Sequence, residues 1–290
     1  MISPRHVAEK LSSFRTLPSV ANRLLVVVSN SESDASDIAR VISMDLALTA
    51  NVLKAANSAF YGFSKPVSSL TEATFRLGVN WVAQMAVSSL VYGNVNRPAA
   101  GYGQSALDIW RHSAAVAVTS ENLCRLLHLK GSNAIFTAAL IHDIGKLAIE
   151  EFVAEHLPEI RRRLEHDHES FEQAEREILG YDHAELGAIV AERWNFPQEL
   201  VQAVRWHHDP NQAEADHQAV DIIHVADAMC IMQGIGIGHD GLSYRPCADS
   251  LQRLNITNAI VETAASQMLD SLAEIESMFS EAPSFAGAER

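Results

Sequence analysis

The sequence predicts an all-α protein with two helical lobes. Helix start signals, in which Ser, Thr or Asp precedes an apolar stripe of period 3.6, recur along the 290 residues. The one continuous β-branched run, Val26 to Val28, shows no alternation and no hairpin turn follows it, so we expect it to be helical. A cluster of Pro, Gly and small residues at 97–103 predicts a connection between the lobes. We therefore expect an N-terminal helical lobe over 1–100, a second helical lobe over 101–245, and a C-terminal helical extension over 246–290.

The predicted helices of the N-terminal lobe each have a start signal. Ser3 and Pro4 favour a helix start, because Ser is a good N-cap and Pro suits the first helical position. Ser69 and Glu72 have capping-box spacing and predict the start of a long helix. The remaining boundaries give helices at 17–30, from Asp34 or Ser36 onward, at 45–60 and at 69–90.

The second lobe and the extension continue the helical pattern. The predicted helices are 107–127, 134–152, 172–179, 184–194, 198–208 and 220–232, followed by 256–278 in the extension. Residues 234–238 alternate Gly with Ile, which is too rich in glycine for a helix and predicts an irregular turn. This turn lacks the preceding strand and the following Lys-Ser/Thr of a phosphate-binding loop, so we do not assign it to phosphate binding. We expect the tail at 282–290 to be frayed.

Composition excludes several classes of function. A formal net charge of −14 leaves no basic footprint for nucleic acid and none for an anionic membrane surface. The three cysteines, Cys124, Cys230 and Cys247, are widely spaced and predict reduced thiols. The first residues resemble no signal peptide, and the longest apolar run, at 24–28, is too short to span a bilayer. We therefore expect a cytoplasmic protein with no membrane and no nucleic-acid partner.

Seven residues of metal-ligating type occur in an ordered series. They are His112, His142, Asp143, His183, His207, His208 and Asp227. Imidazole nitrogens mixed with carboxylate oxygens suit Fe, Mn, Zn or Ni rather than Ca. The gaps between the successive groups run from 19 to 40 residues, about one helix plus a connection, so the ligands would converge from five helices. The series therefore predicts a centre of one or two transition-metal ions in the second lobe.

The alternative for any single histidine is a hydrogen-bonded core residue. The chain has 13 histidines, so part of the order can arise by chance. Outside the series, we expect core or surface roles for His128, His156, His166, His168, His217, His224 and His239.

The series divides into two ligand sets that share Asp143. His142 and Asp143 are expected within the apolar helix 134–152, where adjacent side chains diverge by about 100°. A carboxylate beside a histidine can bridge two ions about 3.5–4 Å apart, and a water between them would have a lowered pKa. The first set is His112, His142, Asp143 and Asp227, and the second is Asp143, His183, His207 and His208.

Lys146 is a second candidate catalytic residue beside Asp143. It follows Asp143 by three residues, so on one helix the two would share a face, and its ammonium could contact a phosphate oxygen. A solvent-exposed helical lysine is the alternative. Asp108, one turn before His112, and Asp182, next to His183, are candidates for outer partners or additional ligands.

The series and its flanking motifs resemble the HD superfamily of metal-dependent phosphohydrolases, and more specifically its HDOD subfamily. The resemblance covers roughly 17–232. The motifs that carry it are LKAANSAFYG at 53–62, ALIHDIGK at 139–146, YDHAELG at 181–187, ERWNFP at 192–197 and WHHDP at 206–210.

The resemblance implies a bacterial signalling or regulatory module that acts through a signalling protein partner or a small phosphorylated ligand. Many HDOD domains have lost metal ligands, whereas every ligand type is in place here. An active phosphohydrolase acting on a nucleotide or other phosphoester is the alternative. Cyclic-di-GMP hydrolysis is not expected, because Asp209, Pro210 and Asn211 stand where HD-GYP enzymes carry Gly-Tyr-Pro. Of the two hypotheses, the N-terminal lobe favours the signalling module, because it contains no catalytic constellation of its own.

Overall fold

The computed structural model describes residues 19–29, 33–58, 60–95, 98–129, 132–167, 169–213, 217–239 and 246–280. Throughout these ranges the secondary structure is helical, and the described residues contain no β-strand, only an antiparallel bridge between Ala99 and Gln104. The all-α prediction is therefore confirmed. The helix predicted at Ser3 and the tail at 282–290 lie outside the described residues.

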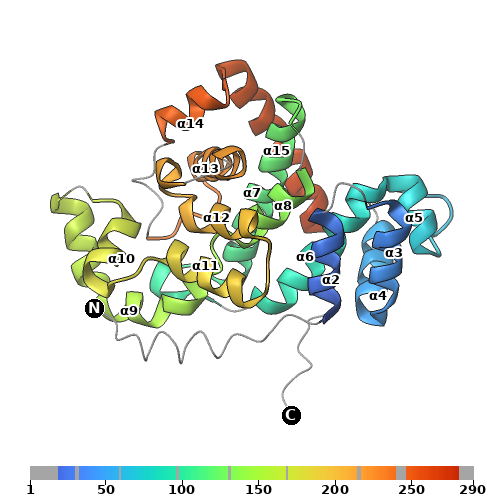
Figure 1. The fold of residues 1–290 in the computed structure, drawn as a ribbon, viewed down its shortest axis with the longest axis horizontal. Helices are drawn as coiled ribbons and strands as arrows, with labels where there is room; N and C mark the ends of the chain where they lie inside the picture. The colour runs from blue at the N-terminus through green and yellow to red at the C-terminus, as the bar shows by residue number, and fades with distance from the viewer. Residues whose placement is uncertain are drawn as a thin grey trace, which may run out of the picture.

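Helices α2 to α6 pack on one another and form the N-terminal lobe, at the right of Figure 1. Their bounds are α2 Ser19–Ser29, α3 Ala35–Ser43, α4 Leu46–Ala56, α5 Leu70–Leu77 and α6 Val79–Val95. The run at 26–28 is helical, as predicted, and Asp34 and Ser69 are N-caps. The single long helix predicted at 69–90 is wrong, because Gly78 has a φ of +92° that ends α5.

The second lobe contains the helices that surround the candidate site. They are α7 Ala106–Leu126, α8 Ser132–Ile141, α9 Lys146–Arg162, α10 Phe171–Leu179, α11 His183–Arg193, α12 Gln198–Trp206 and α13 His217–Met232. The extension adds α14 Ala248–Arg253 and α15 Asn258–Ser280. The continuous helix predicted at 134–152 is wrong, because residues 142–145 form a turn between α8 and α9.

Helix α7 is the centre of the fold. It packs against α8, α13 and α15, and nearly all of its residues between Ile109 and Cys124 are buried. Small residues such as Ala114, Ala115 and Ala117 let these neighbours approach closely, as expected for a helix that is apolar on most sides. Buried apolar residues form a continuous core through both lobes. The predicted boundary near residue 100 stays a prediction.

Residues 98–104, which we call the interlobe segment, join α6 to α7. They form a short 3-10 helix, Ala100–Tyr102, closed by the Ala99–Gln104 bridge. Tyr102 is fully buried, so the segment is built into the second lobe and is more than the exposed linker that its composition suggests. Gly101 is required where the segment meets α9, because a Cβ there would lie 2.7 Å from the backbone nitrogen of Ala154.

Candidate metal centre

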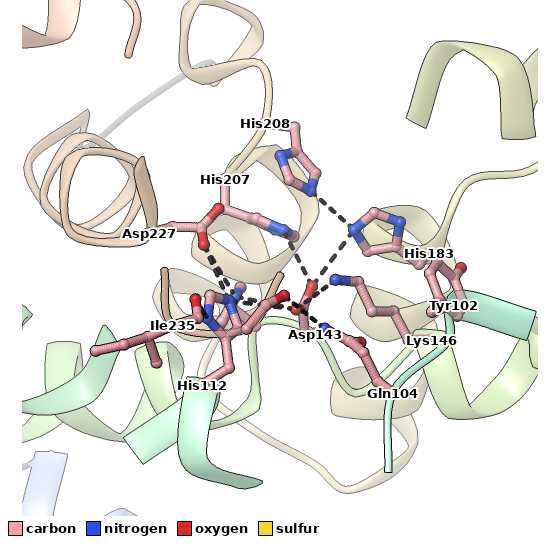
Figure 2. Close-up of polar contacts among 12 residues, drawn as sticks. Tyr102, Gln104, His112, Asp143, Lys146, His183, His207, His208, Asp227 and Ile235 are labelled. Atoms are coloured by element: carbon pink, nitrogen blue, oxygen red, sulfur yellow. Dashed lines mark hydrogen bonds and ion pairs between the residues drawn. The ribbon is translucent and has the colours of Figure 1, made fainter. Parts of the chain in front are cut away.

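The seven predicted ligands lie together in the second lobe (Figure 2). His112 comes from α7, His142 and Asp143 from the turn after α8, His183 from the start of α11, His207 and His208 from the end of α12, and Asp227 from α13. All are buried except His208, which is partly exposed. The prediction that these side chains converge from five helices is therefore confirmed, and their binding of a metal stays a prediction.

The turn at 142–145 directs Asp143 into this cluster. The chain leaves α8 through short-range hydrogen bonds, from the Ile144 amide to the Ile141 carbonyl and from the Lys146 amide to the Asp143 carbonyl, each of 2.9 Å. Gly145 packs directly on the start of α11, where an added Cβ would overlap the His183 carbonyl group. This close approach brings the turn against the helix that provides His183.

His142 and His207 are oriented by the same local device. Each follows the last residue of a helix and donates from Nδ1 to the carbonyl three residues earlier, Ala139 at 2.7 Å and Val204 at 2.6 Å. These carbonyls belong to the last helical turn, where intrahelical partners run out. Because Nδ1 is the donor, the Nε2 lone pair of each ring faces the centre of the cluster.

His112 and His183 are oriented by acceptors from elsewhere in the fold. Nδ1 of His112 donates to the carbonyl of Ile235, at 3.2 Å. Nδ1 of His183 donates to the carboxylate of Glu175, at 2.7 Å. Four of the five imidazoles thus have an outer acceptor on Nδ1, the arrangement that metal-ligating histidines commonly have.

The two carboxylate oxygens of Asp143 face different histidine pairs. Oδ2 lies 3.6 Å from His112 Nε2 and 3.4 Å from His142 Nε2. Oδ1 lies 3.4 Å from His183 Nε2 and 3.8 Å from His207 Nε2. Among the described ligands, Asp143 is therefore the carboxylate that contacts both halves of the cluster.

The remaining ligands complete each half. Asp227 Oδ1 lies 3.0 Å from His112 Nε2, and His208 Nε2 lies 2.8 Å from His183 Nε2. Ligand atoms of Asp143, His183, His207 and His208 all lie within 4.8 Å of one another. Those of His112, His142 and Asp143 do so as well.

The electrostatics of the cluster favour charged carboxylates. Burial alone would raise the pKa of Asp143, but the Lys146 ammonium, 2.8 Å away, and the neighbouring imidazoles hold it well below its ordinary value. Burial would also raise the pKa of Asp227, and the hydrogen bond and charge of His112 lower it instead to about 2. Both carboxylates are therefore anionic at neutral pH.

The imidazoles of the cluster differ in the direction in which their pKa values are shifted. Burial lowers the pKa of His207 to about 3, so its ring is neutral and able to ligate. Burial would lower the pKa of His183 too, but the charge and hydrogen bond of Glu175 raise it to about 9. An ion bound at His183 must therefore displace a proton.

These residues fit a transition-metal ion. His142 Nε2 and Asp143 Oδ1 are buried and have no hydrogen-bond partner among the described residues. Leaving such groups unsatisfied is costly, and a cation bound at each of the two atoms would satisfy them. The donor set, imidazole nitrogen with carboxylate oxygen, suits Fe, Mn, Zn or Ni, and the buried histidine and aspartate groups can hold a metal.

The space in front of the ligands is small. A cavity of about 20 Å³ lies among His112, Asp143, His183, His208 and Asp227, and its other walls come from α9, α10, α13 and the 234–238 turn. This is room for about one water molecule.

The residues that surround the cluster differ in part from those predicted from the sequence. Asp108 is exposed, and its carboxylate accepts from the amide and the hydroxyl of Ser105, the N-cap of α7, so its proposed role near the metal is wrong. Asp182 caps α11 by accepting from the Glu185 amide and so supports the helix that begins with His183. Glu175 was not predicted, because it precedes His183 by eight residues on a different helix and has no motif that reveals the contact.

The glycine-rich turn at 234–238 supports His112. We expect Gly236→Ala to weaken metal binding by the half that contains His112, because a Cβ at Gly236 would lie 2.7 Å from the Cβ of His112 and overlap its ring. Gly234 is the matched control, since both glycines have a φ of +82° but a Cβ at Gly234 meets nothing within 4 Å. Both variants bear the same backbone strain, of about 1–3 kcal/mol. Zn²⁺ titration should show a lower affinity in Gly236→Ala and an unchanged affinity in Gly234→Ala. Equal Zn²⁺ binding by both variants would refute this role of the turn.

The HDOD domain family matches residues 14–210 of the sequence. The chain belongs to the HDOD family. Among curated proteins, this HDOD chain is 24% identical over 226 residues to an uncharacterised protein of Treponema pallidum, covering 73% of the chain and 41% of that protein. It is 29% identical over 164 residues to a ribonuclease Y of Thermus thermophilus, covering 56% of the chain and 23% of that enzyme. The chain thus spans less than half the length of either relative.

Three solved structures share the fold. An HDOD domain protein of unknown function from Geobacter sulfurreducens matches with a TM-score of 0.72 and 21% identity, over 95% of this chain and 97% of that one. A Shewanella amazonensis protein named as a candidate phosphohydrolase matches with a TM-score of 0.68 and 26% identity, over the same shares. A candidate signal transduction protein of Marinobacter aquaeolei matches with a TM-score of 0.74 and 20% identity, over 96% of this chain and 65% of that one.

Among the described helices, none is both long and apolar enough to cross a membrane.

Proposed function

We propose that this HDOD protein is a signalling module whose second lobe contains a dinuclear transition-metal centre. The first ion is held by His112, His142, Asp143 and Asp227. The second is held by Asp143, His183, His207 and His208. Asp143 bridges the two ions, as carboxylates do in two-metal sites.

One observation carries the assignment of two ions rather than one. The two oxygens of Asp143 face separate pairs of imidazole nitrogens, at 3.4–3.6 Å on one side and 3.4–3.8 Å on the other. A mononuclear site would gather its ligands around one oxygen or chelate through both, and would leave one histidine pair without an ion.

The small volume of the cavity supports a regulatory role over turnover. Its volume of about 20 Å³ admits a water but no phosphoester. Lys146 is 5% exposed and its ammonium pairs with Asp143, so at the wall of this cavity it already neutralises a buried carboxylate. We propose that metal occupancy instead sets the conformation through which the protein contacts a signalling partner.

A phosphohydrolase is the second candidate function, favoured by the complete ligand set. A bound metal pair would supply a water of lowered pKa. The 26% identical Shewanella protein is named as a candidate phosphohydrolase, and ribonuclease Y is a nuclease by name. In this hypothesis the cavity opens to admit a small phosphoester, for which Lys146 is the nearest cation.

Turnover separates the two functions. We expect metal-loaded protein to release no product from a panel of nucleotides, cyclic nucleotides and bis-p-nitrophenyl phosphate above the background of Asp143→Ala. Steady-state assays with Mn²⁺ and with Zn²⁺ measure this directly. Turnover that Asp143→Ala abolishes would overturn the purely regulatory function and establish the hydrolase.

A further inference from the structure

The interlobe segment reaches the candidate metal centre through one side chain. Tyr102 is fully buried, and its hydroxyl donates to Oε1 of Glu175, which is also fully buried. The other carboxylate oxygen, Oε2, accepts from Nδ1 of His183 at 2.7 Å and from the His183 amide at 3.0 Å. Glu175 thus occupies both of its oxygens, one with the segment and one with the ligand.

The same tyrosine ring contacts the centre from a second side. Lys146 Nζ lies 5.3 Å from the ring centroid of Tyr102, within range of a cation–π interaction, while it pairs with Asp143. The ring of His183 meets that of Tyr102 edge-on, with centroids 6.0 Å apart. Figure 2 shows Tyr102 beside Lys146 and His183.

The backbone of the segment is fixed tightly enough to hold this side chain. The Tyr102 carbonyl accepts from the His239 amide at 2.8 Å, and the Gln104 side chain donates to the Gly236 carbonyl at 2.7 Å. Gly101 lies directly against α9. The segment precedes α7 in the chain, so Tyr102 lies where the chain enters the second lobe.

We propose that Tyr102 is a positioning residue of the metal centre and that it couples the second ion to the interlobe segment through Glu175 and His183. This inference rests on the proposed dinuclear function. The coupling is reciprocal. An ion bound at His183 stabilises the position of the interlobe segment, and displacement of the segment lowers the affinity of the site for that ion.

Tyr102→Phe tests the proposal, since it removes only the hydroxyl. The matched control is Tyr181→Phe, which removes a hydroxyl two residues from His183 that makes no hydrogen bond within the described part of the chain. Competition of Zn²⁺ against a chromophoric chelator measures both affinities, and thermal melting without metal measures folding. A merely structural role would change the melting temperature of Tyr102→Phe and leave its Zn²⁺ affinities at the wild-type values.

We expect Tyr102→Phe to weaken the binding of the second ion by a few-fold, up to the about 10-fold that loss of a direct outer partner such as Glu175 costs, and to leave the binding of the first ion unchanged. Glu175→Gln should weaken the same ion, and adding Tyr102→Phe to it should cost less than it does alone. Hydrogen exchange of the Tyr102 amide, which donates to the Ala99 carbonyl, should slow on Zn²⁺ addition in wild type and not in Tyr102→Phe.

Two results would overturn the coupling. If the wild-type protein binds two ions and Tyr102→Phe binds both with unchanged affinity, the role of Tyr102 is refuted and the dinuclear function is not. Wild type that binds fewer than two ions would refute the dinuclear function and this inference with it.

Discussion

Asp143→Ala is expected to lose both metal ions. Asp143 is the ligand that faces both histidine pairs, so its removal takes a ligand from each ion at once. The affinity for each should fall by more than about 100-fold, which exceeds the cost of losing an outer partner. Equilibrium dialysis with Zn²⁺ measures the loss.

Two further variants make this result interpretable. Asp143→Asn keeps the volume and an acceptor for Lys146, so it retains the fold while it loses the bridging charge. Asp108→Ala removes an exposed carboxylate one turn from His112. It should cost about 1 kcal/mol of stability, because the capping box of α7 loses its carboxylate acceptor, and the variant should still bind both ions. An Asp143→Asn protein that still binds two ions at wild-type affinity would contradict the assignment of the bridge.

Gly145→Ala is expected to destabilise the metal-free protein by about 3 kcal/mol or more, the upper range for overpacking. Its φ of −67° suits any residue, so the cause is steric alone. The new Cβ would overlap the His183 carbonyl oxygen and lie 2.6 Å from the Gly187 amide nitrogen, both backbone atoms that cannot rotate away. The melting temperature should fall by about 6 °C or more, and metal binding should weaken because the turn and α11 are forced apart.

Gly187→Ala is the matched control for this steric argument. Gly187 lies on α11 against the same turn, but its added Cβ would make only tight contacts without overlap, at 3.1 Å from the Val204 side chain and 3.3 Å from the Gly145 amide nitrogen. A Gly to Ala change within a helix gains about 0.5–1 kcal/mol, which offsets the small adjustment. Gly145→Ala and Gly187→Ala proteins with equal melting temperatures would show that the turn tolerates separation from α11.

Local signals in the sequence were sufficient to predict most of the helices. Asp34 and Ser69 cap the helices they were expected to begin, because an N-cap acts over three or four residues and is visible in the sequence. The prediction of one continuous helix at 69–90 was wrong at Gly78, because the sequence gives no indication that this isolated glycine has a positive φ. The seven residues of the series, chosen by type and order alone, lie together in the structure, and their role as ligands stays a prediction.

The three-dimensional support of the site could not be predicted in the same way. The turn at 142–145 interrupts an apolar run that has normal helical periodicity, and the reason is the contact between Gly145 and α11, more than 35 residues later in the sequence. The hydrogen bonds of Glu175 to His183 and to Tyr102 depend likewise on the packing of α10 and the interlobe segment. Such contacts follow from tertiary structure and have no periodic signature.

The most direct test of the dinuclear centre is the metal content of the wild-type chain. Protein loaded with Mn²⁺ or Zn²⁺, freed of unbound ions and analysed by ICP-MS should contain about two equivalents per chain, as expected for a carboxylate-bridged pair. A content of one equivalent or none would contradict the account, because one histidine pair facing Asp143 would then hold no ion.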